Sequence, residues 1–331
     1  MIGVDKLKLC ILIPAYNEEK TIGSVIQEIS KNMKSIDQIE VIVVDDGSSD
    51  KTSTIARDSG AVVYSFPQNR GLAKAISFGF LKGIERKADI LVILDADNQY
   101  DSKEIPLLIE PILQGKADII IGNRQVKTLS HMPIQKKIGN QLVSRVLSGL
   151  IGQKIIDAQT GFRAFSKEAL ARLHIFSSYT YTQETLMQAK FKGLKILEVP
   201  VSFRERHDKS RLISNIFTYG MRTISLIAST IVFYRSFKFF TILSIILFTI
   251  GASLSAFILN HFYSTGQVSP YYPTALLAVL FLITASISTF FTIFSTILNR
   301  QSKLLEEILY SLRKNPNFEY QDRKEEKSEE S

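Results

Sequence analysis

Asp95, Ala96 and Asp97 directly follow the apolar run at residues 90–94. Two carboxylates that flank a small residue at the end of a buried strand can hold a divalent cation, and Gln99 just beyond them offers another hard oxygen ligand. Negative charge at such a place is costly unless something neutralises it. We therefore predict a divalent metal site here, of the kind that grips the diphosphate of a nucleotide.

The chain up to residue 208 alternates short β-rich runs with amphipathic stretches, which predicts an α/β domain with a mostly parallel sheet. Such sheets bind ligands at the carboxyl ends of their strands. Polar motifs beginning at Pro14, Asp45 and Asp95 fall at such ends, so we expect them to meet at one edge. The predicted strands are 7–13, 39–44, 61–66, 89–94 and 118–121, and the predicted helices are 21–32, 52–59, 72–85 and 105–113.

The 331 residues carry a net charge of +8, and this charge is unevenly distributed. From Lys209 to Leu305 there is no Asp or Glu, and between Lys238 and Arg300 there is no Lys or Arg. The positive charge beside an apolar segment favours an anionic membrane surface or anionic substrates as partners, and we expect no nucleic acid. The lone Cys10 excludes a disulfide framework and a cysteine zinc site, and a reducing, cytosolic location follows for the first half.

Two uncharged apolar segments, 239–259 and 272–298, are each long enough to cross the hydrocarbon core of a bilayer. The short connection at 260–271 predicts a transmembrane hairpin. That connection has no Lys or Arg, whereas basic residues flank the outer ends, so a multi-pass protein of the cell membrane with both termini in the cytoplasm is expected. A hairpin buried inside a soluble protein is the alternative. The hairpin also offers a surface for homo-oligomer formation.

Residues 210–235 mix apolar side chains with arginines, as a basic helix or helix pair in a membrane interface would. The predicted organisation therefore has four parts. They are a catalytic domain at 1–208, amphipathic interface helices at 209–236, the transmembrane hairpin at 237–299, and a cytoplasmic helix with a disordered charged tail at 300–331.

The motifs at the strand ends resemble those of family 2 glycosyltransferases of the Rossmann-like GT-A fold, which has a mostly parallel mixed sheet. The motifs are IPAYNEE at 13–19, VVDDGSSDKT at 43–52 and LDAD at 94–97. Four more match the branch that includes dolichol-phosphate mannose synthases and other polyprenyl-phosphate glycosyltransferases: NRGL at 69–72, GNR at 122–124, DAQTGFR at 157–163 and EVPV at 198–201. The order and spacing of the motifs make the resemblance specific.

By this resemblance Pro14, Tyr16 and Glu18 contact the nucleotide. The residue types suit that role, because a carboxylate can accept hydrogen bonds from ribose hydroxyls and an aromatic ring can pack on a base.

The resemblance also implies that Val44 and Asp46 meet the base, with Asp46 accepting hydrogen bonds from its N–H groups. The segment after Asp46 is equally typical of a turn followed by a helix N-cap. We expect both roles together, with Asp50 or Ser49 as the cap and Asp46 as the ligand.

The metal is implied to be Mg²⁺ or Mn²⁺, held by Asp95, Asp97 and Gln99, with Ala96 beside the nucleotide sugar. Such a metal neutralises the charge that grows on the departing nucleoside diphosphate, which makes Asp97 a catalytic residue. A merely structural acidic turn is the alternative.

The acceptor in this branch is a phosphate, which needs no general base, unlike a sugar hydroxyl. Its second pKa is near ~6, so it is already largely dianionic and needs chiefly cations that position it. The resemblance assigns Arg124 to this task. Lys136 and Lys137 align less well, and solvated surface charge is their alternative.

Arg206 and Arg211 lie in a basic run where the family carries an Arg, a Gly and a Ser-Lys pair. Here the Gly is absent and the last base is an arginine. We expect both arginines, with Arg206 counted as catalytic, to clamp the donor diphosphate or the acceptor phosphate by bidentate contacts. Attraction to lipid headgroups is the alternative.

Asp157 and Gln159 are implied to line the sugar and acceptor side. Glu184 lies where related enzymes with hydroxyl acceptors keep a catalytic acid, and here it could instead hold sugar hydroxyls or orient a basic neighbour. The four histidines show no ligand spacing.

The resulting hypothesis is an inverting transfer of mannose from GDP-mannose to dolichol (polyprenyl) phosphate. UDP-glucose or UDP-N-acetylglucosamine as donor is the first rival, and a non-catalytic membrane-tethered nucleotide-sugar binding protein is the second. A processive polysaccharide synthase is excluded, because its acceptor-site motif requires a Trp and the chain has none.

Overall fold

The computed structural model describes residues 7–30, 33–130, 132–175, 181–205 and 216–314, with the backbone alone over 216–235. The chain divides into two compact units. Unit 1 comprises Met1–Gly220 and Tyr310–Ser331, and unit 2 comprises Met221–Leu309. The predicted division into four parts follows other boundaries and stays a prediction.

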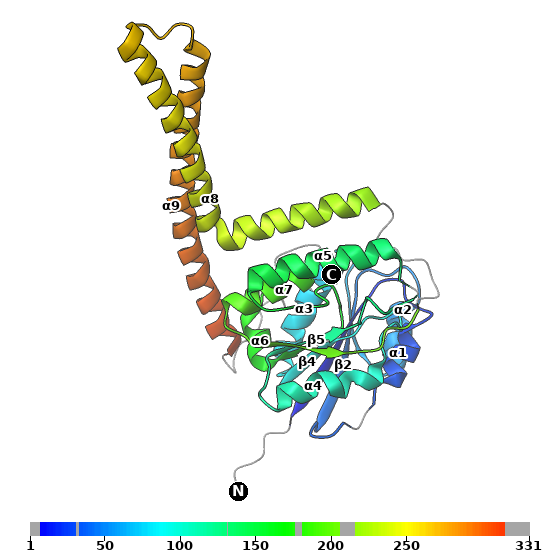
Figure 1. The fold of residues 1–331 in the computed structure, drawn as a ribbon. Coiled ribbons are helices and arrows are strands. Elements are labelled where there is room, and N and C mark those ends of the chain that lie inside the picture. The colour runs from blue at the N-terminus through cyan, green and yellow to red at the C-terminus, as the bar shows by residue number, and fades with distance from the viewer. Residues whose placement is uncertain (1–6, 31–32, 131, 176–180, 206–215, 315–331) are drawn as a thin grey trace. The chain divides into compact units, whose positions relative to one another are not determined.

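Within the described residues, seven strands of unit 1 form one mixed sheet in the order β3-β2-β1-β4-β6-β5-β7 (Figure 1). β6 runs antiparallel to β4 and β5, and the other neighbours run parallel. The bounds are Lys8–Ala15 (β1), Gln38–Asp45 (β2), Val62–Ser65 (β3), Ile90–Ile93 (β4), Ile119–Asn123 (β5), Arg163–Ser166 (β6) and Ile196–Pro200 (β7). The five strands predicted from the sequence are confirmed, whereas β6 and β7 were missed.

The four predicted helices are also confirmed, although the first ends early because Ile29 adopts an extended backbone. A single 3-10 turn at Ser102–Glu104 precedes α4. The helices of unit 1 are Ile22–Glu28 (α1), Thr52–Asp58 (α2), Leu72–Glu85 (α3), Ile105–Leu113 (α4), Ile134–Ile151 (α5), Lys167–Arg172 (α6) and Tyr181–Phe191 (α7).

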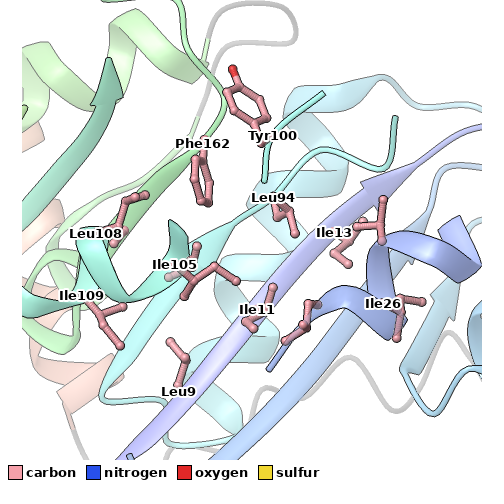
Figure 2. Packing of buried hydrophobic residues seen from close by; sticks show 14 of the residues in the cluster. Leu9, Ile11, Ile13, Ile26, Leu94, Tyr100, Ile105, Leu108, Ile109 and Phe162 are labelled. Carbon is pink, nitrogen blue, oxygen red and sulfur yellow. The ribbon is translucent and has the colours of Figure 1, made fainter. Parts of the chain in front are cut away.

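The main core lies between one face of the sheet and helices α1 and α4. Successive side chains of a strand point to opposite faces, so Leu9, Ile11 and Ile13 of β1 share the face that meets this core. Figure 2 shows them packed with Ile26 of α1 and Ile105 of α4. The core thus fixes β1 and β4, whose carboxyl ends carry the predicted site.

Helix α3 covers the other face at close range. A methyl group at Gly79 would overlap with the side chain of Leu12, and one at Gly83 would lie 2.5 Å from Leu91 Cδ1. Both leucines belong to strands that end at the predicted site, so these two glycines let α3 press against β1 and β4.

Unit 2 is a helical hairpin that contains most of α8 (Ile216–Thr265) and most of α9 (Tyr272–Lys314). Among the described residues, Ser236–Thr265 and Tyr272–Lys314 are two helices long and apolar enough to cross a membrane. Only 6% and 17% of their most apolar windows are buried, which argues against the alternative of a hairpin hidden in a soluble core.

The two helices of the hairpin pack through small residues. Ala285 and Ser288 of α9 are buried, Ser244 Oγ donates to the Ala285 carbonyl at 3.0 Å, and Ser288 Oγ donates to the Phe240 carbonyl at 3.0 Å. Small and hydroxyl-bearing residues at a helix interface are typical of membrane proteins, since they allow close backbone approach.

Candidate active site

The loops that follow β1 and β2 are joined into one piece at the edge of the sheet. Asn17 N–H donates to Ser48 Oγ at 2.8 Å, and Ser49 N–H donates back to Asn17 Oδ1 at 2.8 Å. Asn17 has a left-handed backbone with φ of 54°, and Glu18 N–H donates to Thr52 Oγ1. The two predicted nucleotide motifs are therefore neighbours in space.

The predicted nucleotide residues differ in accessibility. Tyr16 is 40% exposed and Glu18 is partly buried, which leaves both reachable by a ligand. Pro14 and Val44 are buried members of β1 and β2 and pair with each other in register. Pro14 and Val44 are therefore positioned to shape the site through the backbone.

Asp46 organises the loop before α3. It is buried, and its Oδ1 and Oδ2 accept hydrogen bonds from the N–H groups of Arg70 and Gly71 at 2.7 and 2.9 Å. Gly47 has φ of +72°, and a Cβ there would lie 2.5 Å from the Gln68 carbonyl carbon. Asp46 therefore holds a loop in addition to its predicted contact with a base.

The N-cap position of α2 is Lys51, which makes no side-chain cap hydrogen bond, so neither Asp50 nor Ser49 is the N-cap residue that we predicted. Asp50, one position earlier, instead accepts the Thr52 N–H with its Oδ1 at 2.9 Å. Burial raises the pKa of Asp50, but hydrogen bonds from Thr52 outweigh it and hold the pKa below its usual value. The carboxylate is thus ionised and engaged at the start of α2.

Asp95 and Asp97 follow β4 in a loop whose Asn98 has φ of 59°. Gln99 N–H donates to Asp97 Oδ1 at 3.2 Å. Gly161 lies directly against Asp95, because a Cβ at Gly161 would be 2.9 Å from both Asp95 carboxylate oxygens. This position therefore requires a glycine if the carboxylate is to keep its place.

Arg124 and Asp157 form a buried two-pronged ion pair. Arg124 Nε and Nη2 each donate to an Asp157 carboxylate oxygen at 2.8 Å, and the guanidinium lies 5.2 Å from the ring centre of Phe203. Burial alone would lower the pKa of Arg124, but Tyr100 and Asp157 raise the pKa above its usual value. The guanidinium therefore stays charged, and the pair as a whole is close to neutral.

The loop that carries Asp157 is held from two sides. Glu198 of β7 accepts hydrogen bonds from the N–H groups of Ile156 and Asp157 at 2.9 and 3.0 Å. Burial raises the pKa of Glu198 above its usual value, and these N–H bonds oppose the shift. These hydrogen bonds fix the position in which Asp157 pairs with Arg124.

Arg163 is a fully buried guanidinium that sequence reasoning missed. It donates to the carbonyls of Ala158, Thr160 and Thr182 at 2.8, 3.0 and 2.6 Å, and to Thr185 Oγ1 at 3.0 Å. Burial lowers the pKa of Arg163 to about 10, so it remains charged at neutral pH. The residue ties the loop after Asp157 to the start of α7.

The first turn of α7 carries Glu184, which is partly buried and accepts a hydrogen bond from Gln188 Nε2 at 3.2 Å. Arg163 therefore links the loop that bears the predicted Gln159 to the helix that bears Glu184.

A short segment after β7, residues 202–204, is bound to the loop after Asp97; we call it the Arg204 strap. Arg204 N–H donates to the Gln99 carbonyl at 2.7 Å, and Gln99 Nε2 donates to the Arg204 carbonyl at 3.3 Å. The Arg204 guanidinium reaches Asn98 Oδ1 and Asp101 Oδ2, both at 3.0 Å. The strap holds the loop after Asp97, which bears the predicted metal ligands, against the segment that follows β7.

Arg124 and Asp157 thus form an ion pair, and the negative charge of Asp95 also raises the pKa of Arg124. Lys137 instead directs its Nζ at the Lys127 carbonyl, at 3.5 Å. Arg206 and Arg211 lie outside the described residues.

The predicted metal ligands are few. Within the described ranges no group of three or more His, Cys, Asp and Glu side chains could hold a metal ion by itself. Two aspartates and one amide fit a hard divalent ion only if a ligand supplies further oxygens. The close approach of Gly161 to the Asp95 carboxylate leaves this donor at its place at the end of β4.

The chain is similar in sequence to known glycosyltransferases. The family "Glycosyl transferase family 2" matches residues 10–173. The chain is 34% identical over 219 residues to the UDP-N-acetylglucosamine–dolichyl-phosphate N-acetylglucosaminyltransferase of Methanococcus voltae, covering 60% of this chain and 85% of that one. It is 31% identical over 225 residues to the dolichol-phosphate mannosyltransferase of Pyrococcus furiosus, covering 64% and 62%.

A solved structure agrees in fold. Glucosyl-3-phosphoglycerate synthase from Mycobacterium tuberculosis, in complex with Mn²⁺, UDP and phosphoglyceric acid, superposes with a TM-score of 0.54 at 25% identity, covering 68% of this chain and 78% of that one. The mixed sheet is that of a GT-A domain. The chain is a glycosyltransferase and belongs to glycosyl transferase family 2.

Proposed function

We propose that the protein transfers a hexose from a nucleotide sugar to a polyprenyl phosphate with inversion at the anomeric carbon. The observation that carries the proposal is that Asp95 and the Arg124–Asp157 ion pair lie at the same carboxyl edge of the sheet, after β4 and β5. Two apolar helices of spanning length support a lipid acceptor. Both relatives named above act, by their names, with dolichol or dolichyl phosphate.

On the donor side, Tyr16, Glu18 and Asp46 would bind the nucleoside. Asp95, Asp97 and Gln99 would hold Mg²⁺ or Mn²⁺, which supplies Lewis-acid help to the departing diphosphate. The Mn²⁺ in the related synthase supports a divalent ion without choosing between the two.

On the acceptor side, a phosphate oxygen would form the new bond to the anomeric carbon while the bond to the nucleoside diphosphate breaks, giving a β-linked sugar phosphate. A dianionic phosphate needs no proton removed, so its orientation is the main requirement. Arg124 would help to orient the phosphate. Because it is paired with Asp157, it would add little net charge to the site. Attraction of the phosphate would then fall to Arg206, Arg211 and Lys137.

The donor sugar is the finer part of the proposal. GDP-mannose is our first expectation, and UDP-N-acetylglucosamine is favoured by the relative from Methanococcus voltae, which shares more identity than the mannosyltransferase. Membership of the family argues against the non-catalytic binding protein. A location in the cell membrane with both termini cytoplasmic, and self-association through the hairpin, remain part of the proposal.

A donor screen tests this function. Purified full-length protein would receive Mn²⁺, dolichyl phosphate and one of three radiolabelled donors, GDP-mannose, UDP-glucose or UDP-N-acetylglucosamine. We expect one donor to label a lipid that organic solvent extracts. Release of free sugar without labelled lipid, for every donor, would contradict the proposal.

A further inference from the structure

Tyr100 ends the loop that carries the predicted metal ligands, and it is not among the predicted site residues. It is 3% exposed, and among the hydrophobic residues that form the main core within the described ranges it alone carries a hydroxyl group. Figure 2 shows its ring beside Phe162, with the hydroxyl directed away from the apolar side chains of the core. A buried tyrosine hydroxyl needs hydrogen-bond partners, and the partners of Tyr100 indicate what it does.

The hydroxyl of Tyr100 holds the segment that lies against Asp95. It shares a hydrogen bond of 3.0 Å with Thr160 Oγ1, and it accepts the Gly161 N–H at 3.3 Å. Gly161 is the residue at which a Cβ would lie 2.9 Å from both Asp95 carboxylate oxygens. The hydroxyl therefore fixes the backbone that limits where the Asp95 carboxylate can lie.

The ring of Tyr100 contacts the Arg204 strap. Its centre lies 5.1 Å from the ring centre of Phe203 in an edge-to-face arrangement, and the two residues form an isolated antiparallel backbone bridge. The Phe203 ring also receives the Arg124 guanidinium, 5.2 Å from its centre. Phe203 therefore contacts both Tyr100 and the cation of the Arg124–Asp157 pair.

A purely structural tyrosine is the simpler explanation, because tyrosines in cores commonly find partners for their hydroxyl groups. Tyr64 on β3 is a tyrosine of that kind, since its hydroxyl accepts hydrogen bonds from Nε and Nη2 of Arg86 at 3.2 and 3.1 Å, and neither residue belongs to the candidate site. Tyr100 differs from it, because both of its hydroxyl partners lie in the DAQTGFR motif and one of them abuts Asp95.

We propose that Tyr100 is a positioning residue of the transfer reaction. Its hydroxyl places the Asp95 carboxylate for the metal through Gly161, and its ring places Arg124 through Phe203. One side chain would thus set the metal and the acceptor phosphate relative to each other. The proposal deepens the proposed function and rests on it for the metal and for the acceptor.

The two contacts of Tyr100 can be removed separately. Y100F removes the hydroxyl and keeps the ring on Phe203, so it tests the route through Gly161. F203L keeps the hydroxyl of Tyr100 and removes the ring on which Arg124 lies, so it tests the route through Phe203. Y64F is the matched control, since it also removes a hydroxyl with two hydrogen bonds but leaves the candidate site unaltered.

The route through Gly161 is measured as Mn²⁺ binding without turnover. Full-length protein would be titrated with Mn²⁺ in the presence of GDP in one series and UDP in another. The free ion would be followed by its electron paramagnetic resonance signal, against a blank that contains the nucleotide alone. Loss of a group that orients a metal ligand typically costs about 10–100-fold in metal affinity.

Tyr100 acts on Asp95 through Gly161, so we expect the low end of this range. With the nucleotide that binds, Y100F should raise the Mn²⁺ concentration at half-saturation by about 10-fold, and Y64F should leave it unchanged. An equal shift for Y64F and Y100F would overturn the inference, because a general loosening of the domain would then explain both.

Two negative results have different meanings. If the unaltered protein binds Mn²⁺ and Y100F binds it equally well, the proposed function stands and only this inference fails. If the unaltered protein binds no Mn²⁺ with either nucleotide, the metal assignment of the proposed function fails, and the inference fails with it.

A double-mutant cycle tests whether the effect passes through Gly161. The methyl group of G161A meets the Asp95 carboxylate directly, so Y100F should add little to the shift in Mn²⁺ half-saturation that G161A already causes. Full additivity of the two effects would show that Tyr100 acts by another route and would overturn the proposal. If G161A does not fold, the comparison of Y100F with Y64F decides alone.

The route through Phe203 is measured as the KM for the acceptor. Loss of the ring beside Arg124 should raise the KM of F203L for polyprenyl phosphate by about 2–5-fold, the cost of one cation–π contact, and leave the Mn²⁺ concentration at half-saturation nearly unaltered. Y100F should show the reverse pattern. A merely destabilised protein would show neither split, and an unchanged KM for F203L would overturn the role of the ring.

Discussion

The predicted donor side and the predicted acceptor side of the candidate site are built in different ways. On the donor side, loops after β1 and β2 are joined by hydrogen bonds between backbone N–H groups and short polar side chains, such as Asn17 with Ser48. On the acceptor side, buried arginines form the frame: Arg124, which is paired with Asp157, and the fully buried Arg163.

The two sides therefore owe their rigidity to different interactions. The loops of the donor side leave Tyr16 exposed, so a nucleotide from solution would reach its ring directly. The acceptor side would have to meet a phosphate held in a membrane, and its charged groups are locked in place by one another. Breaking one element on each side should therefore have different consequences.

The largest effect is expected for D97N. A metal ligand should matter at least as much as the groups that orient ligands, whose loss typically costs about 10–100-fold, so we expect turnover to fall by roughly 100-fold or more. D58N, an exposed acid on α2, is the control. Initial rates and melting temperature would be measured, and near-normal rates for D97N would refute the metal assignment.

G161A tests where the two sides touch. The added methyl would meet the Asp95 carboxylate, so we expect an activity loss of about 10–100-fold and a higher Mn²⁺ concentration for half-maximal rate. G149A on α5 is matched, because a Cβ there meets nothing within 4 Å. Identical Mn²⁺ dependence in both variants would disprove the close contact.

R163K tests the buried frame. Lysine keeps the charge but cannot reach the partners of the planar guanidinium, and buried carbonyls left unpaired cost about 1–3 kcal/mol each. We expect the free energy of unfolding to fall by about 3 kcal/mol. The control R57K, at an exposed arginine, should melt like the unaltered protein, and an unchanged melting temperature for R163K would contradict its structural role.

R204A tests the strap between the two sides. Loss of the contacts to Asn98 and Asp101 should loosen the metal loop and raise KM for the donor by roughly 10-fold, with a smaller effect on kcat. R204K should recover part of the loss. A change in kcat alone would place Arg204 elsewhere in the reaction.

The smallest effect is expected for E184Q. A general base typically contributes about 10²–10⁴-fold, whereas a phosphate acceptor needs none, so kcat should fall by less than about 10-fold. A fall in kcat of about 10²–10⁴-fold would contradict this expectation, because Glu184 would then act as a general base and the acceptor side would carry proton-transfer chemistry.

Much of the donor side was predictable from the sequence because its motifs are local. The apolar runs before Asp45 and Asp95 predict two strands. The predicted carboxyl ends of these strands agree with the observed ends of β2 and β4 to within two residues. A polar contact at the start of α2 was predictable for the same reason, since Asp50 accepts from a residue two positions away, although the N-cap position itself is Lys51.

The acceptor side was less predictable because its contacts join distant residues. β6 is four residues long and contains Arg163 and Ser166, so it has no strand pattern, and its partners lie in β4 and β5. The Arg204 strap joins residues more than 100 positions apart. The placement of Arg163 in the DAQTGFR motif was visible, but its burial was not.

The most direct test of the account compares two acceptors that differ by one phosphate. Full-length protein with Mn²⁺ and its donor would be given dolichyl phosphate or the matching dolichol alcohol over a range of pH. We predict transfer to the phosphate alone, with a rate that rises as pH passes the second phosphate pKa near ~6. Transfer to the alcohol, or a pH dependence that E184Q abolishes, would contradict an acceptor side built to position a phosphate.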